Sequence, residues 1–289
     1  MNRRTATLWG VAAFGLLVGF FVAGRRRHYQ RTGHWIELSS SMSGWFERPV
    51  ADGGDTPEDV PAPETIEWCA EGLLALPGGG CFRAPEGGRG PWPLIIYLHG
   101  IFDPAAATDE LSRQSRVAAL GVAKGFAVLA LRGHAGECSA AEYASRICWP
   151  SNEKNEDGGP SFVSEWKAPL LDATKRGASG KRYVFGFSNG GYFAGLLAER
   201  AWFEANGFVV ARGGPVSPVK ASGEKVPLLL TLSEDDPSHD EMVKLDLALT
   251  ENEWPHERFM SQGGHALPDA DIEAAVTFFV KQERGEKAP

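Results

Sequence analysis

From about residue 66 onward, short apolar runs alternate with amphipathic segments along the rest of the chain. Several of these runs are apolar at consecutive positions, which is typical of strands that helices cover on both faces. The alternation predicts an α/β fold, with a mostly parallel sheet flanked by helices on both faces. A ligand site is then expected at the carboxyl ends of the strands.

Six strands and five helices are predicted in this region. The strands are expected over residues 93–100, 126–133, 181–188, 208–214, 226–233 and 256–262. The helices are expected over about residues 107–123, 161–177, 190–205, 238–251 and 269–283. With 43% hydrophobic and 23% charged residues, the composition is that of a globular protein with a sizeable core.

The charge balance limits the classes of partner. The chain has 37 acidic and 29 basic side chains, which gives a net charge of -8. Nucleic-acid binding requires a basic surface that neutralises phosphates, so this balance disfavours a nucleic-acid partner. The acidity identifies no other partner, and the sequence does not indicate an oligomeric state.

Residues 5–24 form an uncharged stretch that lies between two clusters of arginine. A helix of this length rises about 30 Å, enough to cross the hydrocarbon core of a bilayer. We therefore expect an N-terminal transmembrane helix, with residues 1–27 as a membrane anchor. The alternative is a cleaved signal sequence, because Val22-Ala23-Gly24 fits a small-residue cleavage site.

Residues 28–65 lack a sustained periodicity and include a stretch rich in Pro, Gly and acidic residues, which predicts a linker. Residues 66–289 are then expected to form one folded domain.

Because arginines flank the apolar stretch over residues 5–24 on both sides, the positive-inside rule does not favour export of the domain.

The four cysteines fall into two local pairs. Cys69 and Cys81 are 12 residues apart, and Cys138 and Cys148 are 10 residues apart. The spacing lacks the paired C-x-x-C motifs of a structural zinc site, and we expect no metal and no organic cofactor. Locally paired cysteines behind an apolar N-terminus suit disulfides in an oxidising compartment, and four unrelated buried thiols are the alternative. We expect the domain on the periplasmic or extracellular side of the membrane, or secreted if residues 1–24 are cleaved.

The sequence VFGFSNGG, residues 184–191, places Ser188 between Gly186 and Gly190 directly after an apolar run. With 35 glycines in 289 residues, a G-x-S-x-G match alone is weak. Here, however, a predicted strand precedes the serine and a predicted helix follows it. A sharp strand-to-helix turn needs small residues beside the serine, and it presents the hydroxyl as a nucleophile.

A serine hydroxyl is a poor nucleophile unless a base takes its proton and an acid orients that base. Of the seven histidines, His265 has the expected place, in a loop between the last predicted strand and the last predicted helix. Gly263 and Gly264 give this loop the freedom to bring the imidazole to the site. Asp236 is the predicted acid, because it follows a strand end by three residues and precedes a proline turn. Asp235 is the alternative.

Backbone amides can stabilise the negative charge that develops on a reacting carbonyl. The segment YLHGIFD, residues 97–103, ends a predicted strand at His99-Gly100, so that the amide of Ile101 can point at the site. The amide of Asn189, at the start of the helix after the serine, is its expected partner in an oxyanion hole. For His99 we expect structural hydrogen bonds and no proton transfer.

Together these residues resemble the α/β-hydrolase superfamily over about residues 80–285. The resemblance rests on the His-Gly segment, the Gly-Phe-Ser-Asn-Gly elbow and the chain order Ser188, Asp236, His265. It implies that Ser188 is the nucleophile, Asp236 its charge partner and His265 the general base. The compact pattern with GGHAL looks most like catalytic domains of the dienelactone-hydrolase, polyester-depolymerase and prolyl-oligopeptidase types.

The resemblance implies a carboxylesterase-like serine hydrolase that cleaves a small-molecule ester through an acyl-enzyme. A serine peptidase or amidase acting on a short peptide is the alternative within this fold, and a non-catalytic binding domain is the alternative outside enzymes.

Two segments bear on the shape of the expected pocket. Residues 213–225, between two predicted strands, are too few to hold a helical lid domain. Residues 136–160 form a long insertion that either walls the substrate pocket or is a surface loop stapled by its cysteines.

Overall fold

The computed structural model describes residues 68–105, 109–138, 140–151, 158–216, 218–219 and 224–286. All of them belong to one compact unit, residues 61–289. The expected transmembrane helix, the anchor over residues 1–27 and the linker over residues 28–65 lie outside the described residues and stay predictions. Within the described ranges, no helix combines the length and hydropathy that a bilayer crossing requires.

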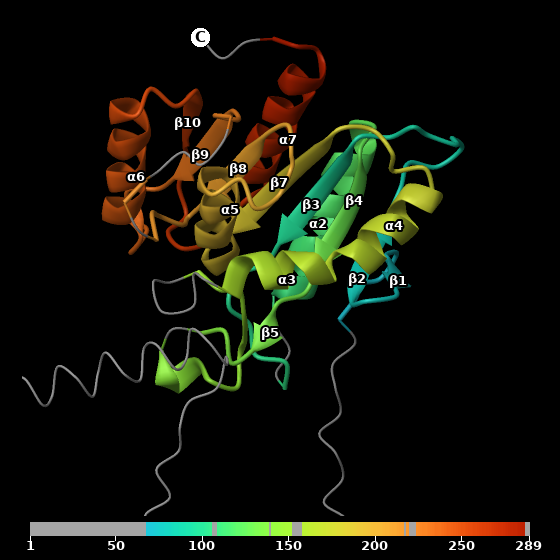
Figure 1. Cartoon of the computed structure of the whole chain (residues 1–289), viewed down its shortest axis with the longest axis horizontal. Coiled ribbons are helices and arrows are strands. Elements are labelled where there is room, and N and C mark those ends of the chain that lie inside the picture. The colour runs from blue at the N-terminus through green and yellow to red at the C-terminus, as the bar shows by residue number, and fades with distance from the viewer. Residues whose placement is uncertain are drawn as a thin grey trace, which may run out of the picture. The chain divides into compact units, whose positions relative to one another are not determined.

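An eight-stranded sheet forms the centre of this unit, in the order β1-β2-β4-β3-β7-β8-β9-β10 (Figure 1). Strand β2 pairs antiparallel with β1 and β4, and the other pairs are parallel. The strands are β1 Leu74–Leu76, β2 Gly80–Arg83, β3 Leu94–Leu98, β4 Ala127–Leu131, β7 Arg182–Phe187, β8 Phe208–Ala211, β9 Leu228–Leu232 and β10 His256–Met260. A separate hairpin pairs β5 His134–Ala135 with β6 Ile147–Cys148.

Helices cover both faces of the sheet. They are α2 Glu110–Ala123, α3 Gly159–Glu165, α4 Lys167–Lys175, α5 Asn189–Glu199, α6 His239–Glu251 and α7 Asp269–Glu283, with a short 3-10 helix at Ala141–Tyr143. One apolar cluster joins the sheet to α3, α4, α5 and α6, and a second joins it to α2 and α7. In Figure 1, α6 lies beside β9 and β10, and α4 lies toward the opposite edge of the sheet near β1.

Strand β3 explains why a nearly continuous apolar run predicts a covered strand. Successive side chains of a strand point to opposite faces. Ile96 therefore packs in the cluster with α5, whereas Ile95 and Tyr97 pack in the cluster with α2 and α7. All three are 0% exposed, because helices cover both faces of the central strands.

The structure confirms the predicted α/β fold and all six predicted strands, with β1 and β2 of the main sheet and the hairpin strands β5 and β6 as additions. The predicted helix over residues 161–177 is wrong in its continuity, because α3 ends at Glu165 and α4 begins at Lys167. Pro169 has no amide hydrogen to donate to the Glu165 carbonyl, so the first helix cannot continue through it. The helix predicted to reach residue 205 ends at Glu199, since Ala201 takes a left-handed φ of 51°.

Both predicted cysteine pairs are disulfides. The Cα atoms are 5.3 Å apart in Cys69–Cys81 and 5.2 Å apart in Cys138–Cys148. The first bond ties the segment before β1 to β2, and the second ties the inserted segment to β6. None of the described cysteines is a free thiol, so the alternative of unrelated buried thiols is wrong.

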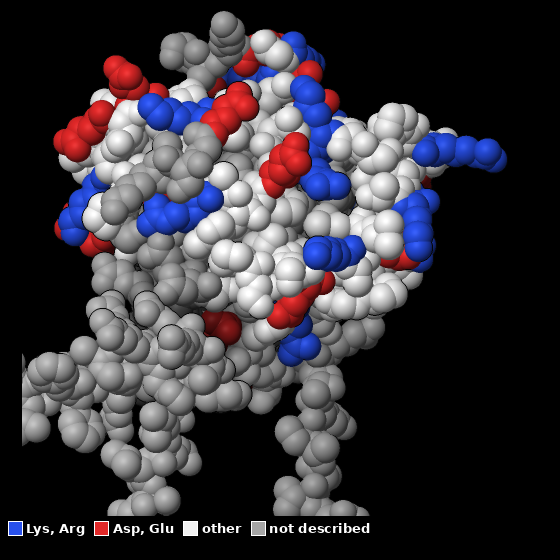
Figure 2. All heavy atoms as spheres, in the orientation of Figure 1, with Lys and Arg blue, Asp and Glu red and all other residues white. Residues whose placement is uncertain are grey.

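Acidic and basic side chains are interspersed on the surface. On the face in Figure 2, blue and red residues lie near one another both at the rim and within it, with uncharged surface between them. The basic side chains on this face therefore do not gather into one continuous surface of the kind that binds phosphates.

Candidate active site

The predicted site residues lie at one edge of the sheet. Ser188 follows β7, Asp236 lies in the loop after β9, and His265 lies in the loop after β10. Because these strands are parallel, their carboxyl ends meet at the same edge. The Oγ of Ser188 lies 2.7 Å from Nε2 of His265, and Nδ1 of His265 lies 3.0 Å from each carboxylate oxygen of Asp236.

The turn that holds Ser188 is strained. Ser188 has a φ of 54° and a ψ of −120°, a conformation that residues other than glycine rarely adopt. A Cβ at Gly186 would collide with the carbonyl of Gly190, and a Cβ at Gly190 would collide with the carbonyls of Leu98 and His99. Glycine is therefore required on both sides of the serine, as the motif predicts.

Two left-handed glycines precede the histidine. Gly263 has a φ of 111° and Gly264 a φ of 59°, and both lie in the loop between β10 and α7. This backbone turn brings the imidazole of His265 over the sheet edge, where its side chain remains 42% exposed. Its Nδ1 faces a carboxylate and its Nε2 faces a hydroxyl, so the expected tautomer carries the proton on Nδ1 and accepts from Ser188.

Asp236 is the buried member of the group and is only 4% exposed, whereas Asp235 is exposed. The amide and the hydroxyl of Ser238 each donate a hydrogen bond of 2.7 Å to its Oδ1. Burial acts to raise the pKa of Asp236, but the hydrogen bonds from Ser238 and His265 outweigh it and hold the pKa below its usual value. The carboxylate is therefore ionised at neutral pH.

The residues expected to form an oxyanion hole lie beside the serine. Ile101, Asn189, Ser188 and His265 line one solvent-open cleft with a volume of about 550 Å³. The amides of Ile101 and Asn189 donate to no backbone carbonyl of the described residues. Asn189 is the first residue of α5, where a helix leaves its amides unpaired and carries partial positive charge.

His99 is fully buried and structural in its contacts. Its Nε2 accepts a hydrogen bond of 2.9 Å from the amide of Gly133, and its Nδ1 lies 2.5 Å from the carbonyl oxygen of Gly100. Burial lowers the pKa of His99 to about 3, so the ring is neutral. A neutral ring that donates from Nδ1 and accepts at Nε2 satisfies both contacts.

Trp149 lies in the insertion over residues 136–160, for which a wall of the substrate pocket was one of the two predicted roles, and it links the parts of the site. The indole N–H donates a hydrogen bond of 2.9 Å to the carbonyl of His99, and the amide of Trp149 donates one of 2.7 Å to Oδ1 of Asn189. Ile147, two residues before Trp149, exchanges backbone hydrogen bonds with Phe102 in the segment after β3. The sequence placed Trp149 in this insertion but did not indicate its hydrogen bonds to His99 and Asn189.

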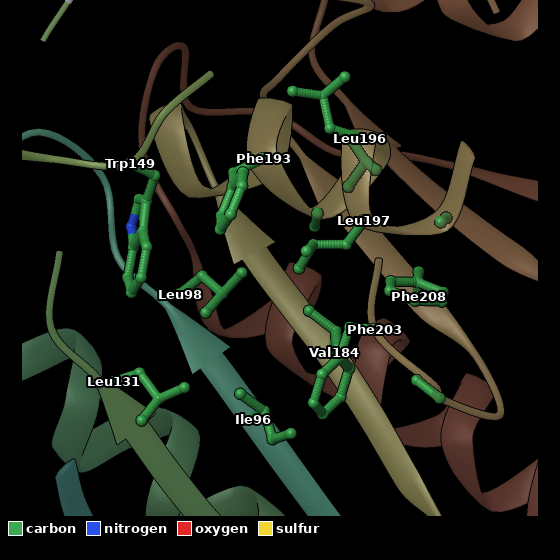
Figure 3. Close-up of a cluster of buried hydrophobic side chains, with 14 of the residues drawn as sticks. Ile96, Leu98, Leu131, Trp149, Val184, Phe193, Leu196, Leu197, Phe203 and Phe208 are labelled. Carbon is green, nitrogen blue, oxygen red and sulfur yellow. The ribbon is translucent and has the colours of Figure 1, made fainter. Parts of the chain in front are cut away.

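The insertion over residues 136–160 therefore contributes to the site as well as to the surface. Ser151 lines the cleft and accepts a short hydrogen bond from the side-chain amide of Asn189. The ring of Trp149 stacks on that of Phe193 with 5.8 Å between centroids, and Figure 3 shows the two rings beside Leu98. Residues 152–157 lie outside the described part.

The remaining lining of the cleft is mixed. Tyr192, Pro237, Ser238 and Glu241 complete it. Burial, with a further contribution from Glu241, raises the pKa of Tyr192, so its hydroxyl stays protonated at neutral pH. Among the described residues no group of His, Cys, Asp and Glu side chains is arranged to hold a metal ion.

Solved structures of the same fold resemble this chain over most of their length. A carboxylesterase from Bacillus cereus superposes with a TM-score of 0.54 at 17% identity, covering 70% of this chain and 93% of the other. Esterase PE8 gives a TM-score of 0.53 at 16% identity, with coverages of 72% and 99%. Est1E from Butyrivibrio proteoclasticus gives 0.51 at 14% identity, with coverages of 74% and 99%. No protein-family model and no curated protein matches the chain.

The superpositions and the sheet define the class of structure. The mostly parallel sheet with helices on both faces is that of the α/β-hydrolase fold, as the motifs predicted. At these identities the likeness establishes the fold. What the site does must be argued from its own geometry.

We predict that Trp149→Phe lowers the free energy of unfolding by about 1 kcal/mol more than Trp166→Phe does. Both tryptophans pack against Phe193 in the same core, so the two changes remove similar volumes. Only Trp149 also loses a hydrogen bond, because the Trp166 indole N–H has no partner among the described residues. Urea denaturation measures the difference, and equal losses would contradict the role given to the Trp149 indole.

Proposed function

We propose that the chain is a serine hydrolase that cleaves carboxylic esters through an acyl-enzyme. One observation carries the proposal: the hydrogen-bonded series from Ser188 through His265 to Asp236 opens into a cleft that Ile101 and Asn189 also line. These groups match the requirements of acyl transfer, which are a nucleophile, a base, an acid that orients the base, and donors for an oxyanion.

In the first half of the proposed reaction, Nε2 of His265 takes the proton of the Ser188 hydroxyl while Oγ attacks the ester carbonyl. The amides of Ile101 and Asn189 donate hydrogen bonds to the resulting oxyanion. Asp236 stabilises the imidazolium that forms. The imidazolium then gives its proton to the leaving alcohol as the carbon–oxygen bond breaks.

In the second half, water replaces the alcohol. His265 takes a proton from the water, and the resulting hydroxide attacks the acyl-enzyme carbonyl at the same oxyanion site. Collapse of this intermediate breaks the bond to Oγ of Ser188, which recovers its proton from His265. The carboxylic acid product leaves, and the enzyme returns to its starting state.

An ester substrate is favoured over a peptide by the comparisons. Of the structures that superpose on this chain, one is named as a carboxylesterase and another as an esterase. The Ser188, His265 and Asp236 contacts also argue against a non-catalytic domain, since binding alone requires no such arrangement. The cleft is large enough for a small-molecule ester.

We predict that a fluorophosphonate probe labels wild-type protein covalently and that Ser188→Ala abolishes the labelling. The probe reacts with serines that a neighbouring base activates, which is the arrangement of Ser188 with His265. Intact-protein mass spectrometry measures the adduct. Ser164→Ala is the matched control, because Ser164 is exposed and donates only to a backbone carbonyl. Labelling that survives Ser188→Ala would sink the enzyme interpretation.

We predict that Asp236→Asn lowers kcat on a p-nitrophenyl ester by about 10³–10⁴, as loss of the acid does in other serine hydrolases. The amide that replaces the carboxylate favours the wrong tautomer of His265. Asp235→Asn is the matched control, and we expect less than about a threefold change from it, because Asp235 is exposed. The opposite ranking would assign the acid to Asp235.

We also propose that the hydrolase domain begins near residue 66 and works in an oxidising compartment, anchored through residues 5–24. The Cys69–Cys81 and Cys138–Cys148 bonds support this location, since such bonds persist mainly outside the cytosol. The expected result is that all four cysteines resist alkylation until reduced and that the protein stays in the membrane pellet after carbonate extraction. Free thiols in the isolated protein contradict the compartment, and a mature N-terminus near residue 25 contradicts the anchor.

A further inference from the structure

Arg212 lies behind the candidate triad and is fully buried. It is the residue directly after β8, and its side chain is 0% exposed. Its backbone has a left-handed φ of 53°, and its amide donates to the carbonyl of Thr231 in β9. The carbonyl of the preceding Ala211 accepts a hydrogen bond of 2.8 Å from the amide of Ser188. The backbone at Arg212 is thus fixed between the nucleophile turn and β9.

The guanidinium of Arg212 contacts both ends of the histidine loop. Nη2 donates a hydrogen bond of 2.6 Å to Oγ of Ser261 and lies 3.0 Å from Oδ2 of Asp271. Ser261 follows β10 directly, and Asp271 lies in the first turn of α7. His265 lies between Ser261 and Asp271 in the sequence. Arg212 therefore contacts both residues that flank the loop of His265, one after β10 and one at the start of α7.

The same guanidinium faces the acid of the triad. Its Nε lies 3.9 Å from Oδ2 of Asp236, which is an ion-pair distance that is too long for a hydrogen bond. Both side chains are at most 1% exposed, so solvent screens this pair little. The Oδ2 atom that faces Arg212 is also 3.0 Å from Nδ1 of His265.

We propose that Arg212 is a positioning residue of the triad, an inference that rests on the proposed function. Arg212 fixes the His265 loop through Ser261 and Asp271, and its positive charge, on the far side of Asp236, opposes protonation of His265. Arginine suits this place, because its Nη2 contacts Ser261 and Asp271 while its Nε faces Asp236, and because the guanidinium remains charged when buried. Removing it leaves two buried carboxylates without their cation.

The charged and titratable groups around Arg212 set the sign of the effect. Asp236 and Asp271 face Arg212, and His265 lies on the other side of Asp236, with Tyr192 and Glu241 lining the same cleft as His265. Burial raises the pKa of Asp271 despite its contacts with Ser261 and Arg212, and burial also raises the pKa of Tyr192. A neutral side chain at position 212 removes a positive charge near His265 and so favours the imidazolium. A neutral side chain at position 271 removes a negative charge and has the opposite effect.

The experiment follows the protonation of His265 in full-length protein by NMR of ¹³C-labelled histidine, with His265→Gln to assign the signal. In Arg212→Met we expect the titration midpoint to rise by about 0.5–1 pH unit. In Arg212→Lys, which keeps the charge and loses the fork, we expect a midpoint close to wild type. In Asp271→Asn we expect the midpoint to fall. The acid limb of kcat/KM on a p-nitrophenyl ester should move with the midpoint in each variant.

Circular dichroism establishes which variants fold, and Asp271→Asn carries the test if Arg212→Met does not fold. A midpoint unchanged in folded Arg212→Met, or one not lowered in Asp271→Asn, overturns the proposal. The titration needs no turnover, so it reports on Arg212 even if the fluorophosphonate probe fails to label Ser188. Failure of the labelling overturns the proposed hydrolase function, whereas failure of the titration overturns only the role of Arg212.

Discussion

The carbonyl oxygen of His99 accepts two hydrogen bonds, from the amide of Gly190 at 3.1 Å and from the indole of Trp149 at 2.9 Å. These bonds join the end of β3, the start of α5 and the inserted segment. The contact with Gly190 is possible only because that residue has no side chain between the two backbones. Ser188 has a strained backbone conformation, which persists only where several surrounding contacts fix it. The carbonyl of His99 provides such contacts, because it joins the three segments around the serine.

The site has a buried side that solvent does not reach, the dry side, and an exposed side that opens to the cleft, the wet side. Asp236 and Arg212 are at most 1% exposed in their side chains, whereas the side chain of His265 is 42% exposed. Charges on the dry side interact strongly because little water screens them. The ion pair behind the imidazole can therefore influence its protonation, while the opposite side of the ring remains open to ester and water.

Much of this arrangement could be predicted from the sequence because it depends on order along the chain. Parallel strands bring Ser188, Asp236 and His265 to one edge whenever each follows a strand, so strand prediction was sufficient to group them. The short strands β1 and β2 were missed, since three and four residues give no periodic signal. The contacts of Arg212 and Trp149 were missed for another reason. Each residue acts through partners from distant segments, and no local pattern encodes that convergence.

The division between the two sides also locates where substrate selectivity must arise. Every group that the proposed chemistry uses is fixed from behind, by the glycine turn, by Ser238 or by the Arg212 cluster. Ser238 also lines the cleft, whereas the glycines of the turn and the Arg212 cluster are not part of its lining. Discrimination among esters therefore rests on the lining residues that the proposed chemistry does not use, which are Ser151, Tyr192, Pro237, Ser238 and Glu241. Glu241 adds negative charge to this wall, a feature that disfavours esters carrying a carboxylate near the reacting carbonyl.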